Sequence, residues 1–161
     1  MKRILFVCEQ NLCRSPTAEG IFQKLACEQL PDLRLVGHSA GTRVKTPGRE
    51  PSPAACVVAR EHGVNISNLR ARMMVPEDFY RYAYIFAMDF DILSNLSDMR
   101  PDIRATKPQL LLQYTNDTSL REVEDPYGGD LITYNRTFKL ISSGVESFIR
   151  HISKTKETDE S

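Results

Sequence analysis

A thiol, a guanidinium and a hydroxyl stand close together near the start of the chain, in the run Cys8-Glu9-Gln10-Asn11-Leu12-Cys13-Arg14-Ser15-Pro16. Arg14 follows Cys8 after five residues, and its planar guanidinium is suited to binding two oxygens of a phosphate. The field that holds such an anion also favours the thiolate form of a nearby cysteine, which is the nucleophilic form. Ser15 can donate a hydrogen bond to that thiolate, and Asn11 can brace the loop. The segment therefore predicts a phosphate-binding loop with Cys8 as its nucleophile.

The other cysteines carry weaker signals. Cys27 and Cys56 lie within apolar helical patterns and are expected to be buried structural residues. Cys13 is near enough to Cys8 in sequence for the two to form a reversible disulfide. The chain has no Cys-x-x-Cys pair and its three histidines are scattered, so the sequence predicts neither a metal site nor a disulfide scaffold.

The elements around this segment must position its groups. Residues 3–7 form a short apolar run that predicts a buried strand. Ser15 is a good N-cap and Pro16 a good first helical residue, so we expect a helix from there to about residue 30. A loop between a strand end and a helix N-terminus points backbone N–H groups at a bound anion. The predicted elements thus favour the same phosphate site.

In the rest of the chain, predicted strands alternate with predicted helices. We expect strands at 33–39, 83–88 and 109–113, loops at 42–53 and 114–129, and helices at 53–62, 90–99 and 130–152, with Gly63 capping the first of these three helices. Strands alternating with helices predict a parallel sheet with helices on both faces. Ligands bind at the carboxyl ends of such strands, where the Cys8 segment begins.

Composition limits the functions open to this chain. Its 161 residues are 41% hydrophobic and 26% charged, with 21 Lys and Arg against 21 Asp and Glu. Zero net charge argues against a general nucleic-acid binder or a polybasic membrane binder. The apolar run after Met1-Lys2-Arg3 ends at Cys8 and is too short for a secretory signal, and no stretch reaches the ~20 apolar residues of a membrane span. We expect a cytoplasmic protein with one domain, residues 1–152, and a polar tail, residues 153–161.

Four blocks of the sequence resemble a known family. The run from Cys8 to Pro16, followed by Ala18-Glu19, resembles the signature of the low-molecular-weight protein tyrosine phosphatases. Ser39-Ala40-Gly41-Thr42, Ala87-Met88-Asp89 and Asp125-Pro126-Tyr127 resemble its later blocks, in the family's order and at close to its spacing. The resemblance implies a single three-layer α/β domain, a four-stranded parallel sheet flanked by helices in the flavodoxin-like phosphotyrosine phosphatase I fold. It also implies a tyrosine-phosphorylated protein substrate, a cysteinyl-phosphate intermediate and no metal or other cofactor.

The resemblance also implies roles for individual residues. Cys8 becomes the nucleophile, Arg14 the phosphate clamp, Asp125 the general acid and Tyr127 an aromatic wall. The residues expected to form or support the phosphate loop are Glu9, Gln10, Asn11, Leu12, Cys13, Ser15 and Ser39. A phenolate leaving group, whose conjugate acid has a pKa near ~10, needs a positioned acid. From the residues alone, Glu122, Glu124 and Asp130 are not excluded as that acid, and it is the family resemblance that selects Asp125.

Four positions depart from the family pattern. Gln10 stands where the family usually has Gly, and Glu9 where it has an apolar or small residue. Lys45 takes the place of the aromatic that forms the opposite substrate wall, and Gly128 that of a second Tyr. Since Gly permits unusual dihedrals, Gln10 requires either strain or an ordinary φ. These departures predict that the residues at the rim of the site, which contact the substrate, differ from those of the family. The chemistry at the phosphate is expected to be unchanged.

Three other functions are compatible with this pattern. A phosphoarginine phosphatase of the same fold usually has Thr where this chain has Leu12, which favours an aryl substrate. A thiol-dependent arsenate reductase needs further cysteines, and residues 57–161 contain none. A non-catalytic phosphate-binding module would not need Cys8, Arg14 and Asp125 together. We therefore predict hydrolysis of phosphotyrosine and other aryl phosphates.

Overall fold

A four-stranded parallel sheet forms the centre of the computed structural model, which describes residues 1–159. Its strands are β1 (Lys2–Cys8), β2 (Leu35–Gly41), β3 (Tyr84–Ala87) and β4 (Gln109–Leu110), in the order β2-β1-β3-β4. The chain passes to opposite sides of β1 for β2 and β3, so the carboxyl end of β1 lies at a topological switch point. The predicted α/β fold with four parallel strands is confirmed.

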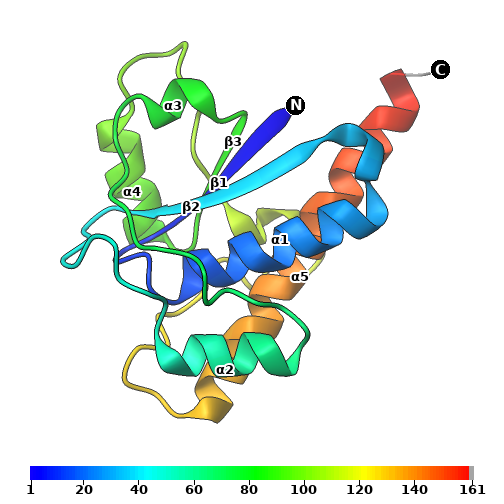
Figure 1. Cartoon of the computed structure of the whole chain (residues 1–161). Helices are drawn as coiled ribbons and strands as arrows, with labels where there is room; N and C mark the ends of the chain where they lie inside the picture. Colours follow the sequence, from blue (N-terminus) through cyan, green and yellow to red (C-terminus); the bar gives the residue numbers. More distant parts are fainter. Residues whose placement is uncertain (160–161) are drawn as a thin grey trace.

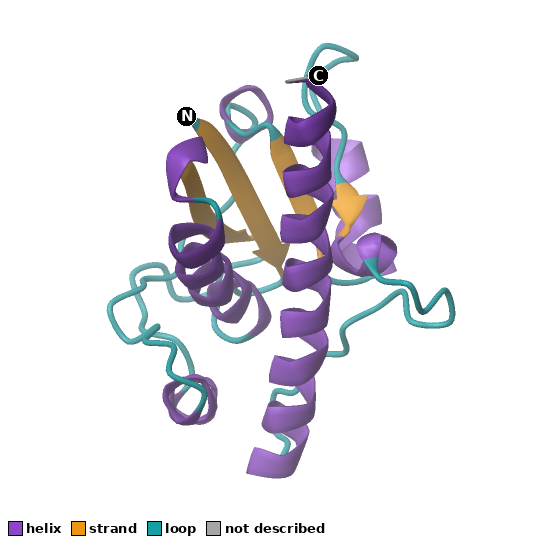
Figure 2. Ribbon diagram, turned by 90° about the vertical axis from the view of Figure 1, so that its right-hand side faces the viewer, coloured by secondary structure: helices purple, strands orange, loops and turns teal. Residues whose placement is uncertain are grey.

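Helices cover both faces of the sheet (Figures 1 and 2). Helices α1 (Arg14–Gln29), α2 (Pro53–Glu61) and α5 (Leu131–Asp159) lie on one side, and α3 (Asp78–Arg81) and α4 (Phe90–Met99) on the other. Helix α1 packs against β2 and α5, while α5 runs alongside the strands in Figure 2. The domain therefore has the three layers that the sequence predicts.

Strand β1 shows how the sequence determines these layers. Because side chains alternate along a strand, Ile4 and Phe6 enter the core shared with α1, α2 and α5. Leu5 and Val7 enter the second core, shared with α3 and α4. All four side chains are 0% exposed, which explains why the run is apolar without interruption. Cys8 continues the Ile4 and Phe6 side of the strand, so its thiol faces the layer that contains α1.

Several element boundaries differ from the prediction. Helix α1 begins at Arg14, so Ser15 lies inside its first turn and is not its N-cap; the N-cap is Cys13, which makes no side-chain capping bond. Strand β4 has only two residues, because the chain turns into a 3₁₀ helix at Leu111–Tyr114. The short α3 was not predicted. Helix α4 has the predicted bounds, and Gly63, with φ of 75°, ends α2 as expected.

The last helix is longer than its apolar pattern indicates. The pattern ends at Ile152, the last residue of the core, whereas α5 continues to Asp159 as a polar extension. The division into a domain of residues 1–152 and a tail stays a prediction, and residues 160 and 161 lie outside the described residues. Within residues 1–159, no helix combines the length and the hydropathy needed to cross a bilayer.

Candidate active site

The loop between β1 and α1 forms a cradle of backbone N–H groups. The carbonyl oxygens of Cys8 and Glu9 accept hydrogen bonds from the backbone of residues 42 and 43, and that of Leu12 accepts one from Ser52. Among the described residues, the backbone N–H groups of residues 10–13 donate to no protein acceptor. Carbonyls held from outside and free N–H groups within the same loop are what an anion site requires.

Gly41 allows this loop to lie close to the end of β2. A Cβ at Gly41 would come within 2.6 Å of the Glu9 carbonyl oxygen and 3.0 Å of the Asn11 backbone nitrogen. Any side chain there would push the loop away from the sheet. The Ser39-Ala40-Gly41-Thr42 block therefore has a direct physical reason for its glycine.

The Cys8 side chain lies at the base of this loop and is 3% exposed. Its Sγ is 2.9 Å from the Ser15 Oγ. The Asn11 side chain is 2% exposed, and its Nδ2 donates to Ser15 Oγ at 2.8 Å and to Ser39 Oγ at 3.0 Å. The structure thus brings the thiol together with three of the residues expected to support the loop, the bracing residues Asn11, Ser15 and Ser39. Ser15 is a partner of the sulfur rather than a helix cap.

Arg14 is buried beside the same sulfur and is 3% exposed. Its Nη1 donates to the Asp89 carboxylate at 2.6 Å and to the Val123 carbonyl at 2.8 Å, while Nε and Nη2 have no protein partner within residues 1–159. Burial lowers the pKa of Arg14, but the neighbouring Cys8 and Asp89 raise it by more, so the net direction is upward. The guanidinium is therefore fixed by one nitrogen and keeps its other edge free for an anion.

A small cavity joins this loop to a segment more than a hundred residues later. Its lining is formed by Cys8, Glu9, Gln10, Leu12, Cys13, Arg14, Asp125 and Tyr127. Lys45 is exposed and, within the described part of the chain, is not among the residues that line it. The structure thus brings Asp125 and Tyr127 to Cys8 but does not bring Lys45 there.

The Asp125 segment is anchored at both sides. The Val123 N–H donates to the Met88 carbonyl at 2.7 Å, which fixes the segment to the end of β3. The buried Pro126 lines a second small cavity together with Cys13 and Tyr134, and Asp125 Oδ1 accepts from the Tyr127 N–H at 3.1 Å. Asp125 and Tyr127 themselves are exposed, so a solvent-facing carboxyl and ring are held above a buried thiol.

Two of the sequence departures have a structural explanation. The left-handed residue of the phosphate loop is Asn11, with φ of 59°, and Gln10 has a negative φ that any residue adopts. Gly128 has φ of 81°, a conformation that disfavours a tyrosine. The conformational freedom of glycine is therefore not needed at position 10.

Cys13 belongs to a second polar cluster behind the loop. Its Sγ lies 3.1 Å from Ser52 Oγ and 3.6 Å from the Tyr134 hydroxyl, and burial raises its pKa. Burial, together with the bond to Cys13, also raises the pKa of Tyr134 to about 12. All four cysteines are free thiols, so a Cys8–Cys13 disulfide stays a prediction. Cys27 is exposed rather than buried, contrary to our expectation.

Sequence reasoning gave no role to several residues that contact the loop. Asp89 pairs with Arg14 and also caps α4, since its Oδ1 accepts from the Ile92 N–H at 2.8 Å. Its position directly after β3, at the carboxyl edge of the sheet, could have indicated a role in the site. The Arg72 N–H donates to Asn11, and Glu19 accepts from Ser39. The Arg72 contact has no signal in the sequence pattern, whereas Glu19 belongs to the Ala18-Glu19 pair that follows the loop signature.

A larger cavity of about 700 Å³ lies between α1, β2 and residues 63–69. Its lining is formed by residues of α1, β2 and that loop, and it contains neither the nucleophile nor the cradle of N–H groups. The small cavity at Cys8 is therefore the better candidate site, because the groups that could perform chemistry converge there.

Comparisons with known proteins agree with this fold. Residues 3–158 match the model of the family described as low molecular weight phosphotyrosine protein phosphatase. A low molecular weight protein-tyrosine-phosphatase of Bacillus subtilis is 31% identical over 98% of this chain and 99% of its own length. The crystal structure of a protein tyrosine phosphatase from Entamoeba histolytica has a TM-score of 0.90 at 28% identity, covering 97% of this chain and 99% of that one. An arginine phosphatase from Geobacillus stearothermophilus has a TM-score of 0.85 at 25% identity, covering 98% and 97% of the two chains.

Proposed function

The chain belongs to the low molecular weight phosphotyrosine protein phosphatase family, and on this premise we propose how its own residues hydrolyse phosphotyrosine. The activity is that of a protein-tyrosine-phosphatase, a phosphoric monoester hydrolase acting on phosphoproteins. The observation that carries the proposal is the convergence of the Cys8 thiol, the Arg14 guanidinium and the Asp125 carboxyl on one cavity.

The first step transfers the phosphoryl group to the enzyme. The free N–H groups of residues 10–13 and the open edge of Arg14 bind the phosphate oxygens above the sulfur. Cys8 Sγ forms a bond to phosphorus as the bond from phosphorus to the tyrosyl oxygen breaks. Asp125, from the rim, gives its proton to that oxygen, so the product leaves as a neutral phenol. The result is a cysteinyl phosphate and a dephosphorylated tyrosine.

The second step returns the enzyme to its starting state. The Asp125 carboxylate takes a proton from a water molecule, whose oxygen bonds to phosphorus as the phosphorus–sulfur bond breaks. Inorganic phosphate leaves, and Cys8 is again a thiolate hydrogen bonded to Ser15. The loop groups that stabilise charge on the phosphoryl oxygens act in both steps.

The rim favours an aromatic substrate. The Tyr127 ring is 71% exposed above the cavity, where it can pack against the ring of a phosphotyrosine. Leu12, an apolar residue, is also among those that line the cavity. Since the mechanism needs Cys8 as a free thiol, we place the enzyme in the reducing environment of the cytosol.

The test compares substrate classes with one enzyme preparation. Phosphate release is measured from a phosphotyrosine peptide, a simple aryl phosphate and a phosphoarginine peptide, and arsenate reduction is measured with thioredoxin or glutaredoxin. We expect the two aryl substrates to have the highest kcat/KM. Faster turnover of phosphoarginine would instead assign the chain the activity of the Geobacillus relative, and thiol-dependent arsenate turnover would identify a reductase. Tight phosphate binding without turnover would identify a binding module.

A further inference from the structure

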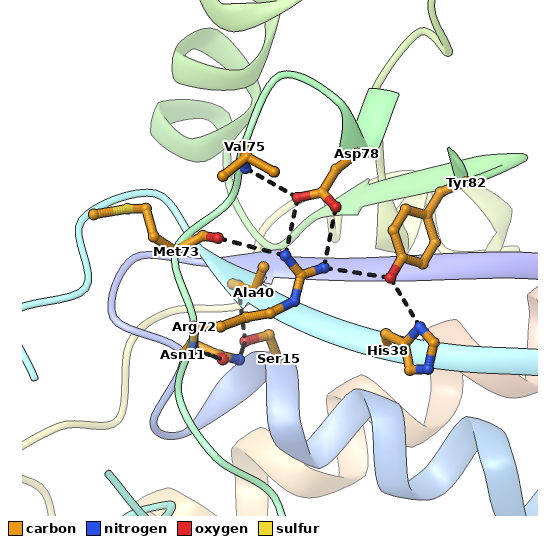
Figure 3. Close-up of polar contacts among 9 residues, drawn as sticks. All are labelled: Asn11, Ser15, His38, Ala40, Arg72, Met73, Val75, Asp78 and Tyr82. Carbon is orange, nitrogen blue, oxygen red and sulfur yellow. Dashed lines mark hydrogen bonds and ion pairs between the residues drawn. The ribbon is translucent and has the colours of Figure 1, made fainter. Parts of the chain in front are cut away.

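A network of hydrogen bonds connects the phosphate loop to a segment behind it, residues 72–78 (Figure 3). Its centre is the buried Asn11, whose Oδ1 accepts from the Arg72 backbone N–H at 3.0 Å. The Asn11 Nδ2 donates to both Ser15 and Ser39. Both ends of this side-chain amide are therefore used, by partners from three separate parts of the chain.

This arrangement determines which atoms donate. A backbone N–H can only donate, so the acceptor end of the Asn11 amide must face Arg72 and its NH₂ end must face the two hydroxyls. Ser15 Oγ accepts from Asn11 and has one proton of its own to give. Cys8 Sγ at 2.9 Å is a closer acceptor for that proton than the Ala40 carbonyl at 3.3 Å. A thiolate has no proton to give, so Ser15 must be the donor when Cys8 is a thiolate, and Asn11, by donating to Ser15 Oγ, leaves the serine proton available for that bond.

A buried carboxylate holds the Arg72 segment in place. Asp78 is 1% exposed and accepts from Arg72 Nη1 at 3.0 Å, from Arg72 Nη2 at 3.3 Å and from the Val75 N–H at 2.9 Å. Arg72 Nη2 also donates to the Tyr82 hydroxyl at 3.3 Å. The carboxylate therefore binds both the side chain of Arg72 and the backbone three residues later, and closes the segment into a fixed turn.

Backbone bonds join the same turn to β2. The Gly41 N–H donates to the Arg72 carbonyl at 2.9 Å, and the Met74 N–H donates to the Gly41 carbonyl at 2.8 Å. Neither Arg72 nor Asp78 lines the cavity at Cys8 within the described chain. These two residues therefore do not contact the reacting groups directly.

We propose that Arg72 and Asp78 are positioning residues, which fix the Asn11 amide so that Ser15 donates its proton to Cys8. The part of the proposal that concerns turnover rests on the proposed phosphatase function. The part that concerns the thiolate does not, because the reactivity of Cys8 toward an alkylating reagent can be measured without any phosphatase substrate.

The first experiment measures the alkylation of Cys8 by iodoacetamide as a function of pH, with mass spectrometry of the Cys8 peptide. The variants are Arg72→Met, Asp78→Asn and Arg72→Lys. Arg70→Met is the matched control, since Arg70 is a nearby exposed arginine that bonds only to Glu50 and to the carbonyls of Ser67 and Leu69 within the described chain. The exposed Cys27 in each variant serves as an internal reference for the reagent.

We expect Arg72→Met and Asp78→Asn to move the pH midpoint of Cys8 alkylation upward by about one unit, since one hydrogen bond to the charged form is weakened. Arg72→Lys should recover part of the shift, because an ammonium can still pair with Asp78. Arg70→Met should leave the midpoint unchanged. For phosphatase turnover, kcat should fall most at acidic pH while KM changes by less than about twofold.

A double-variant experiment separates positioning from the direct effect of a charge. In an Asn11→Ala background, Arg72→Met should cause no additional shift, because its route to Cys8 is already removed. An additive shift, or an equal shift from Arg70→Met, would show that Arg72 acts as a positive charge and overturn the proposal. An unchanged midpoint in a folded Arg72→Met would overturn it as well.

If Asp78→Asn does not fold, the Arg72 variants decide the question. A shift without any phosphatase activity would support the positioning proposal and refute the proposed function.

Discussion

The two sides of the phosphate loop differ in how firmly they are held. On the inner side, Asn11, Ser15 and Ser39 are all buried, and each makes at least two side-chain hydrogen bonds. On the outer side, Glu9 and Tyr127 line the cavity, and the structure gives their side chains no hydrogen-bond partner among the described residues. The inner side can thus hold the atoms that react in one arrangement, whereas the outer side can change without disturbing it.

This difference agrees with the positions of the departures from the family pattern. Glu9, Lys45 and Gly128 all lie on loops at the surface, and Gln10 has a backbone conformation that any residue tolerates. No departure falls on Cys8, Arg14 or the three bracing residues. We infer that the inner side determines the reaction and the outer side determines which substrates bind, and substitutions on each side test that division.

The largest effect should come from the sulfur itself. Cys8→Ser should reduce turnover by roughly 10³-fold or more, because a hydroxyl is a much weaker nucleophile than a thiolate. Phosphate binding, measured by calorimetry, should persist, because the cradle of N–H groups and Arg14 remain. A Cys8→Ser variant that keeps more than a few per cent of the activity would show that another group is the nucleophile.

Arg14→Lys should have the next largest effect. An ammonium cannot pair with Asp89 and also present a planar edge to two phosphate oxygens, so we expect kcat to fall by roughly 10²–10³-fold. Asp89→Asn tests the inner partner separately. It keeps a hydrogen-bond acceptor for Arg14 but removes the charge, and should therefore cost less than Arg14→Lys. The measurement is steady-state kinetics on one aryl phosphate, and kinetics like those of the native enzyme for Arg14→Lys would remove Arg14 from the site.

Asp125→Asn tests a residue that is exposed, like the other residues of the outer side, but is proposed to take part in the reaction as its general acid. Loss of the acid should lower kcat by ~10²–10⁴-fold for aryl phosphates whose phenol leaving group has a high pKa. The loss should be much smaller for aryl phosphates whose phenol has a low pKa and leaves easily without a proton. The measurement is a series of aryl phosphates with leaving groups of graded pKa. Glu124→Gln is the control, as an exposed neighbouring carboxylate outside the cavity lining. An equal loss for every leaving group would mean that Asp125 only shapes the loop.

Most of the inner side could be predicted from the sequence. The order of strands and helices follows from apolar periodicity, and the spacing of Cys8, Arg14 and Ser15 is enough to predict a phosphate site at a strand end. Two predictions failed for local reasons. The hydroxyl of Ser15 turns toward the sulfur instead of capping a helix, and β4 ends after Leu110 because Leu111 and Leu112 are buried in a 3₁₀ turn.

Other contacts of the site could not be predicted, because they depend on how distant segments meet. Arg72 acts on Asn11 through a backbone N–H, which every residue except proline has, so its identity carries no signal for that bond. Asp89 and Val123 bind one nitrogen of Arg14 from two loops that are far apart in sequence. Exposed loop residues such as Lys45 have no periodic pattern, and the expected wall at that position is not part of the cavity lining among the described residues.

The smallest effect is expected on the outer side, at Glu9. Glu9 is among the residues that line the cavity, so its charge should weakly repel a phosphate dianion that enters. Glu9→Leu should therefore lower KM for a simple aryl phosphate by about two- to fourfold at low ionic strength, and by less in salt, which screens charges near the surface. The value of kcat should stay the same, because the inner side is untouched. Glu61→Leu, which removes an exposed carboxylate from the end of α2, is the matched control.

Lys45→Tyr completes the comparison of the two sides. An aromatic side chain at this position would pack against the substrate ring only if the loop approaches the cavity when substrate binds, and such a contact is worth ~0.5–1.5 kcal/mol. In that case KM falls for aryl phosphates, while the inhibition constant of phosphate itself stays the same. An unchanged KM in Lys45→Tyr would place the second wall elsewhere on the rim. A change in kcat for either Glu9→Leu or Lys45→Tyr would contradict the division itself, because it would mean that the outer side also controls the reacting groups.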